Sequence, residues 1–314
     1  MIKIKEVNDL KEAEALWRAL SPNKTIFDEW AFRYCFYKHE PCPLCFLAAY
    51  DEKIGGANKA GVSADAELVG LLPLEKHPKH GYEFFAEDPC EENRLFIKDG
   101  YERIIPQLYA AMPGPGKAYD ISGDDEFTIR LPLEDYKYIL PLAGLKSFDD
   151  FLASRLNAKR RRSLVKEIEE AEKNNIVVEM LGGPDGASAS SALENLFSFN
   201  TGNFGGESYL SKEGQASWRD LLALDFDWRL VVLKIKGVIQ AVSLSVVHNS
   251  EWHYLITGAN FKDFLGLGKM LVKVNLEAAI DAKADFFDAG LGDCGWKHLW
   301  HFDKIPQYLF IKES

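Results

Sequence analysis

The chain has 314 residues, of which 47% are hydrophobic, so it is long enough for two domains with well-packed cores. Its 37 lysine and arginine residues stand against 48 aspartate and glutamate residues, which gives a formal net charge of −11 at pH 7. Because neutralising phosphate supplies most of the affinity for nucleic acid, this balance excludes a general DNA-binding protein and disfavours RNA binding.

The first five residues alternate like a strand and have no apolar core of the kind that a signal peptide needs. No run of the sequence approaches the roughly 18 apolar residues of a transmembrane helix. The sequence therefore predicts a cytoplasmic protein without a membrane span.

Hydrophobic periodicity predicts an α/β arrangement in the first half of the chain. Helices are expected at residues 9–20 and 28–37, and at 96–112, where Pro106 would kink or end the helix. Strands are expected at residues 44–50, 67–74, 82–86, 117–122 and 126–131, with a hairpin through residues 53–56. Residues 131–146 contain two prolines and a glycine and predict a linker.

A second series of predicted helices and strands follows this linker. Helices are expected at residues 149–174, 187–199, 212–224 and 270–282. Strands are expected at residues 176–181, 228–235, 238–247, 252–259, 286–290 and 307–312. We therefore predict two domains, at residues 1–140 and 141–314, each a mixed sheet flanked by helices.

The most informative segment runs from Trp252 to Trp300. A strand leads into a glycine-containing turn, a helix follows the turn, and a second strand follows the helix. Glycine lets the backbone approach an anion, and the helix N-terminus presents N–H groups and the positive end of its dipole. This order predicts a phosphate-binding turn made by Leu265, Gly266, Leu267, Gly268 and Lys269.

The same order of elements resembles the GCN5-related N-acetyltransferase (GNAT) superfamily, in which an R/Q-x-x-G-x-G/A turn holds the pyrophosphate of coenzyme A. Residues 263–268 match this turn: both glycines are present, and Asp263 stands where the family prefers Gln or Arg. The chain most resembles the CelD-like and FemAB-like branch, whose members pair two GNAT-like domains. That resemblance rests on residues 69–74, 156–162 and 287–297.

A basic run, residues 159–162, lies within the predicted helix at 149–174. Arg160 is four residues from both Leu156 and Leu164, which belong to the apolar stripe of this helix, so we expect its side chain to face inward. A buried guanidinium needs an anionic partner, either a carboxylate of the protein or an anion of a ligand. In the resembling branch this helix faces the groove, so Arg160 is a candidate substrate-binding residue.

Candidate catalytic residues follow the strand at 286–290. Transfer of an acyl group to an amine needs a base that accepts the amine's proton. Asp293 is the first candidate and Asp288 the second, although aspartates beside Gly290 and Gly292 could also cap turns. His298 is a further candidate for proton transfer.

Four other residues are candidates for substrate binding. The resembling branch has Tyr-Lys where this chain has Trp296 and Lys297, and the indole cannot act as an acid, so Trp296 would line a pocket. Ser243 and Ser245 alternate with apolar residues along a strand and could face a groove.

Five cysteines are present, and Cys42 and Cys45 form a C-x-x-C close to His39 and Cys35. The pattern suits a zinc knuckle or core thiols. We favour core thiols because there is no second C-x-x-C, and we expect no metal.

The resemblance implies an N-acyltransferase that uses acetyl-CoA or another acyl-CoA as co-substrate. Its acceptor would be the amine of a small molecule or of an envelope or polysaccharide precursor. Two alternatives remain: an aminoacyltransferase of FemAB type that uses aminoacyl-tRNA, and a binding protein of GNAT-like fold without catalysis. The departures at Asp263 and Trp296 motivate the last of these.

Overall fold

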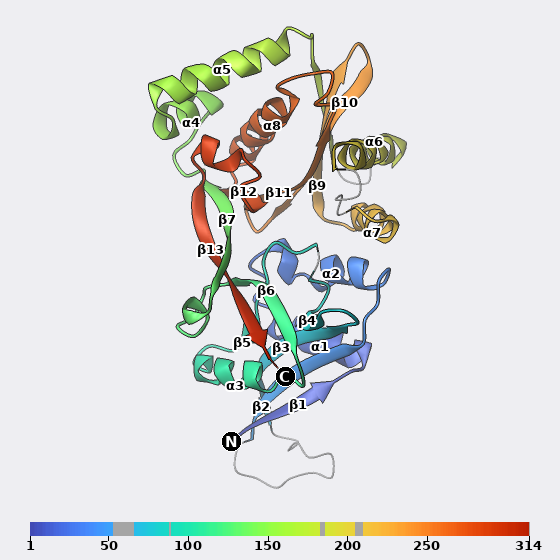
Figure 1. The fold of residues 1–314 in the computed structure, drawn as a ribbon, viewed down its shortest axis with the longest axis vertical. Helices are drawn as coiled ribbons and strands as arrows, with labels where there is room; N and C mark the ends of the chain where they lie inside the picture. The colour runs from blue at the N-terminus through green and yellow to red at the C-terminus, as the bar shows by residue number, and fades with distance from the viewer. Residues whose placement is uncertain (53–65, 88, 183–185, 205–209, 314) are drawn as a thin grey trace. The chain divides into compact units, whose positions relative to one another are not determined.

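The computed structural model describes residues 1–52, 66–87, 89–182, 186–204 and 210–313 (Figure 1). The chain divides into two compact units: unit 1 holds residues 1–135 and 306–314, and unit 2 holds residues 136–305. We predicted a boundary between residues 140 and 141. The last strand, which the prediction gave to the second domain, returns to unit 1 from Pro306 onward.

The sheet of unit 1 is antiparallel except for one parallel pair. Its strands run in the order β1 (Ile2–Val7), β2 (Leu44–Asp51), β3 (Glu67–His77), β4 (Gly81–Phe84), β6 (Gly116–Ser122) and β13 (Asp303–Lys312), and the short β5 (Phe96–Ile97) pairs with β3. The parallel pair is β4 and β6, which meet at Tyr82 and Gly116.

Helices cover both faces of this sheet. The helices are α1 (Leu10–Leu20), α2 (Trp30–Tyr37) and α3 (Ile105–Ala110), with 3-10 turns at Ile26–Asp28, Glu102–Ile104 and Thr128–Arg130. Trp17 of α1 packs edge-on against Phe96 with ring centroids 4.6 Å apart, inside an aromatic core that α2 shares. Helix α3 packs in a separate core with Leu72 and Leu74.

The sheet of unit 2 runs in the order β7 (Leu133–Pro141), β12 (Phe286–Leu291), β11 (Glu251–Ala259), β10 (Val238–His248), β9 (Asp227–Ile235) and β8 (Val177–Gly182). Only β11 and β12 are parallel to each other. The helices are α4 (Phe148–Arg155), α5 (Ala158–Glu172), α6 (Gly186–Phe204), α7 (Lys212–Leu222) and α8 (Leu267–Asp281), with a 3-10 turn η5 (Lys297–Trp300). Figure 1 shows α8 on one face of the sheet and α6 on the other.

Four predicted elements need correction. The helix at 149–174 is two helices, because Asn157 begins α5 and accepts a hydrogen bond from the Arg160 amide at 3.0 Å. Pro106 lies in the first turn of α3, so the helix at 96–112 begins near the proline. Residues 128–130 form a 3-10 turn, and β7 occupies the predicted linker.

The predicted hairpin at residues 53–56 lies outside the described residues. The predicted fold class is confirmed: each unit is a mixed sheet with helices packed on it. Among the helices that the structure describes, none is long and apolar enough to cross a bilayer.

Candidate functional site

The parallel strands β11 and β12 of unit 2 separate part of the way along their length. They pair at Glu251 to His253 and at Phe286 to Asp288, and the registered pairs end there although both strands continue. The register between β10 and β11 shifts at the same level, because Leu255 has no partner opposite it. An extra residue of this kind bends a strand. We call the opening between Tyr254–Ala259 and Ala289–Leu291 the fork.

The predicted phosphate-binding turn follows β11 directly. Gly266 has φ 85° and begins α8, a conformation that side chains other than glycine rarely adopt. A Cβ on Gly266 would lie 3.0 Å from the Cβ of Ala171, and one on Gly268 would lie 3.1 Å from the ring of Phe261. Both glycines therefore allow close packing as well as an open helix N-terminus.

The other residues of this turn differ in exposure. Leu267 is buried, Leu265 is 81% exposed, and Lys269 forms an ion pair with Glu167 of α5 at 2.7 Å. Burial would raise the pKa of Glu167, but hydrogen bonds from Lys269 and Ser163 hold it below its usual value. Lys269 therefore lies in the first turn of α8 with its ammonium group paired to a carboxylate of α5.

Helix α5 connects this turn to the loop after β12. Arg160 at one end donates from Nε to the Leu299 carbonyl oxygen at 2.9 Å, and Nη1 lies 3.8 Å from Glu167. Its Nη2 is buried without a hydrogen-bond partner among the described residues. Arg160 is partly buried, and its contacts are a backbone carbonyl and a carboxylate of the protein.

Asp288 lies in the core rather than at the surface. Its carboxylate is 2.8 Å from Nζ of Lys137 and 3.1 Å from Nδ1 of His253, and it accepts a hydrogen bond from the Gly290 amide. Burial would raise the pKa of Asp288, but Lys137 and then His253 hold it far below its usual value. A carboxylate this acidic and enclosed is a poor proton acceptor, and its geometry favours joining β7, β11 and β12 where the fork begins.

Asp293 and His298 form a dyad in the loop after β12. Nδ1 of His298 lies 2.5 Å from Asp293 Oδ2, and the His298 amide donates to Oδ1 at 2.7 Å. Burial works in the opposite direction, but these hydrogen bonds hold the pKa of Asp293 below its usual value. An ionised carboxylate on Nδ1 places the proton there and leaves Nε2 as the basic nitrogen.

Trp296 and Lys297 lie beside this dyad but have different surroundings. Trp296 is half-buried and packs edge-on against Trp300 and Phe302, with centroids 6.4 and 5.9 Å apart. Lys297 is 4% exposed, donates to the Leu291 carbonyl oxygen at 2.5 Å and lies over the Tyr138 ring. Trp296 can therefore line a pocket, whereas Lys297 holds the end of β12.

Ser243 and Ser245 are fully buried and do not face a groove. Asn275 of α8 donates to Ser243 Oγ at 2.7 Å and accepts from Ser245 Oγ at 3.0 Å. These hydrogen bonds tie β10 to α8, because a buried hydroxyl needs a partner. The two serines alternate with apolar residues along β10 because they lie on the face of the strand that packs against α8.

Sequence reasoning missed two contributors to this region. Glu167 was not among the predicted residues, because its pairing with Lys269 depends on how α5 packs against α8. The bulge at Leu255 has no signal in the sequence, since neither glycine nor proline marks it.

Unit 1 contains the same strand–helix–strand unit in β4, α3 and β6, but its opening is occupied. Oε2 of Glu87 accepts hydrogen bonds from the amides of Phe84 on β4 at 3.0 Å and Tyr119 on β6 at 3.3 Å. Asn93 pairs with β6 beside it at Ile121. Burial raises the pKa of Glu87 well above its usual value. This carboxyl group takes the amides that a ligand would otherwise use.

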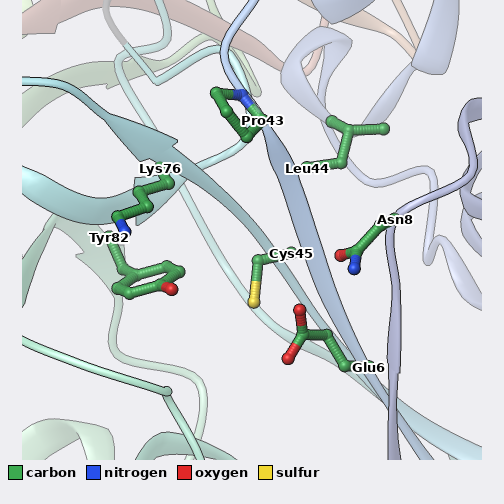
Figure 2. Close-up of a pocket in the computed structure, with 7 residues that line it drawn as sticks. All are labelled: Glu6, Asn8, Pro43, Leu44, Cys45, Lys76 and Tyr82. Atoms are coloured by element: carbon green, nitrogen blue, oxygen red, sulfur yellow. The ribbon is translucent and has the colours of Figure 1, made fainter.

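One cavity of about 300 Å³ lies in unit 1 near the β3–β4 hairpin, and Figure 2 shows the Cys45 thiol pointing into it between Glu6 and Tyr82. Burial, and then Glu6, raises the pKa of Cys45 to about 12, so the group is an unreactive thiol. This supports the core-thiol interpretation of Cys45.

Comparison with known proteins agrees with this geometry. Residues 158–298 match the family model of the acetyltransferase (GNAT) domain, a range that begins at α5 and ends at His298. No curated protein sequence matches the chain. Both ends of the matched range therefore lie in the site described above.

Three solved structures illustrate the shared fold. FemX matches with a TM-score of 0.59 at 11% identity, over 99% of this chain and 97% of that chain. L-PGS from Bacillus licheniformis matches with a TM-score of 0.55 at 13% identity, over 99% and 94%. A tandem GNAT protein from the clavulanic acid biosynthesis pathway matches with a TM-score of 0.51 at 10% identity, over the whole of both chains.

At these identities the likeness shows the fold alone, and the family model adds the identity of the domain. Residues 158–298 therefore match a GNAT domain, and the chain shares its fold with FemX and with a tandem GNAT protein.

Proposed function

We propose that this protein is an N-acyltransferase that moves an acyl group from acyl-CoA to a small-molecule amine in unit 2. The observation that carries the proposal is the fork, with a helix N-terminus at the end of one strand and the Asp293–His298 dyad at the end of the other. The C-terminal ends of two adjacent parallel strands meet at one edge of a sheet, where ligands of α/β folds collect.

The residues present suit coenzyme A. Gly266 and Gly268 lie at the start of α8, and the first amides of a helix have no intrahelical acceptor and can donate to a phosphate. Lys269 can offer its charge to a phosphate if its ion pair with Glu167 loosens. When bound, the coenzyme supplies a thioester carbonyl open to attack by an amine.

His298 would act as the base through Nε2, because Asp293 holds the proton on Nδ1 and stabilises the imidazolium that forms. Backbone amides of β11 at the fork would stabilise the oxyanion. The indole of Trp296 cannot protonate a leaving thiolate, so the His298 imidazolium is the nearest acid for that step.

The test is release of free thiol from acetyl-CoA and longer acyl-CoAs across a panel of small amines, together with calorimetric binding of each acyl-CoA. We expect His298→Gln to lower kcat by about 10²–10⁴-fold, the usual contribution of a general base, while acyl-CoA binding is retained. Gly268→Trp should abolish that binding. Gly202→Trp is the matched control, since a Cβ there meets nothing within 4 Å.

An aminoacyltransferase that uses aminoacyl-tRNA is the alternative, although Asp263 would repel the phosphates of tRNA as it would those of coenzyme A. This carboxylate is exposed, bonds to the Asn260 side chain at 3.0 Å and stands at the head of the phosphate-binding turn, where it repels phosphate. Absence of binding to every acyl-CoA, with transfer from charged tRNA, would replace the acyl-CoA proposal. Acyl-CoA binding without turnover on any amine would favour a binding protein.

A further inference from the structure

The β3–β4 hairpin of unit 1 brings two imidazoles and a carboxylate together. His77 ends β3, His80 lies in the turn and Glu83 lies on β4, and one ligand-type atom from each lies within 4.8 Å of the others. The two imidazole rings are 4.3 Å apart, and Nδ1 of His80 is 3.6 Å from Glu83 Oε2. We propose that these three side chains bind a divalent transition-metal ion, with Zn²⁺ as the best match.

The donor set decides the class of ion. Imidazole nitrogen with carboxylate oxygen is a ligand set of Zn²⁺ and of other late first-row ions, whereas Ca²⁺ and Mg²⁺ prefer oxygen ligands alone. Three protein ligands on one short hairpin leave a fourth position for water. The hairpin closes without a long loop, so the three groups are held together before any ion arrives.

A second observation is a buried carboxyl group next to the proposed ligand Glu83. Glu75 is directly opposite Glu83 in the register of β3 and β4, is 5% exposed, and its Oε2 has no hydrogen-bond partner among the described residues. Two carboxyl groups side by side in a poorly solvated place are stabilised by a cation.

One cation of unit 1, Arg33, is already engaged by backbone carbonyl groups. Arg33 donates to the backbone carbonyl oxygens of Phe27, Phe85 and Glu92 at 2.7, 2.8 and 3.2 Å. Cys42 reports the same negative surroundings, since burial and then Glu75 and Glu83 raise its pKa to about 11. A divalent ion bound to Glu83 would offset this local excess of negative charge.

The ring of His77 shows what metal binding would change. Its Nδ1 accepts weak hydrogen bonds from the amides of Lys79 and His80 at 3.2 and 3.3 Å, so the lone pair of this nitrogen points into the turn. An ion that takes this lone pair displaces both amides. The backbone resonances of residues 79 and 80 are therefore a direct readout of the site.

The experiment uses the full chain, freed of metal with a chelator and titrated with ZnCl₂ by calorimetry, with backbone amide spectra recorded before and after. We expect one saturable Zn²⁺ equivalent per chain, shifts at residues 79 and 80, and a rise in Tm. The double variant His77→Gln and His80→Gln should bind at least 100-fold more weakly, and Glu83→Gln should weaken binding with the fold retained.

His301→Asn is the matched control, because His301 is an exposed histidine in unit 2 with a left-handed backbone that asparagine tolerates. It should bind Zn²⁺ like the wild type. Absence of saturable binding, or affinity that the double variant leaves unchanged, would overturn the site. The readout does not use acyl transfer, so it is independent of the function proposed for unit 2.

Discussion

At the scale of single residues, Asp288 and Asp293 show how surroundings separate two identical side chains. The Asp288 side chain is 3% exposed and contacts Lys137 and His253. The Asp293 side chain is 34% exposed, and the contacts described above join it to the side chain and backbone amide of His298. Both carboxylates are held ionised. The first joins buried strands, and the second is bonded to His298 in a partly exposed loop.

The different surroundings of the two aspartates predict that their substitution changes the free energy of unfolding by different amounts. Asp288→Asn should lower the free energy of unfolding by about 3–5 kcal/mol, because Lys137 keeps a buried charge without its counter-ion. Asp293→Asn should change it by less than about 1 kcal/mol, since this side chain is partly solvated. Urea unfolding followed by fluorescence measures both, and the reverse ranking would contradict the assignment.

At the scale of elements, the strand–helix–strand unit occurs twice with different contents. In unit 2 the registered pairs between β11 and β12 end at His253 and Asp288. In unit 1 the Glu87 carboxyl group bonds to an amide from each strand. The same topology therefore provides an opening in one unit and a filled core position in the other.

The raised pKa of Glu87 predicts a pH-dependent variant. The pKa of Glu87 in the folded protein exceeds its value of about 4.3 in the unfolded chain. Such a group stabilises the folded state fully at pH values below about 4.3, and this contribution is lost as the pH rises toward the folded pKa. Glu87→Gln keeps an acceptor for Phe84 and Tyr119 but removes the proton.

The stability of Glu87→Gln relative to wild type should therefore increase between pH 6 and pH 9, by up to about 1.4 kcal/mol per pH unit. Urea midpoints at the two pH values measure this. Glu126→Gln, at a side chain that is 91% exposed, is the control and should show little pH-dependent difference. A constant difference between Glu87→Gln and wild type would contradict the protonated state of Glu87.

At the scale of the whole molecule, the two units share a strand–helix–strand arrangement but differ in what lies between its parallel strands. The matched GNAT domain lies within unit 2, and the corresponding opening of unit 1 is filled by its own chain. If the protein binds acyl-CoA, calorimetry should give one molecule per chain. Gly268→Trp should abolish acyl-CoA binding. Binding of two acyl-CoA molecules per chain, or binding that survives Gly268→Trp, would place the acyl-CoA site elsewhere.

The sequence by itself determined the α/β class, the order of elements from β8 to β12 and the glycine turn before α8, because these depend on local periodicity and on glycine in a left-handed position. It also identified Asp293 and His298 as neighbours in a loop. Asn157 could have marked the start of α5, since asparagine favours a helix N-cap.

Only the tertiary structure decided which polar residues are enclosed. Asp288, Lys297, Ser243 and Ser245 have ordinary local sequences, and their burial follows from strands and helices distant in the chain. The same holds for the bulge at Leu255, for Glu87 between β4 and β6, and for the return of β13 to unit 1. Burial and hydrogen-bond partners are set by contacts between segments far apart in sequence, and a local pattern cannot report them.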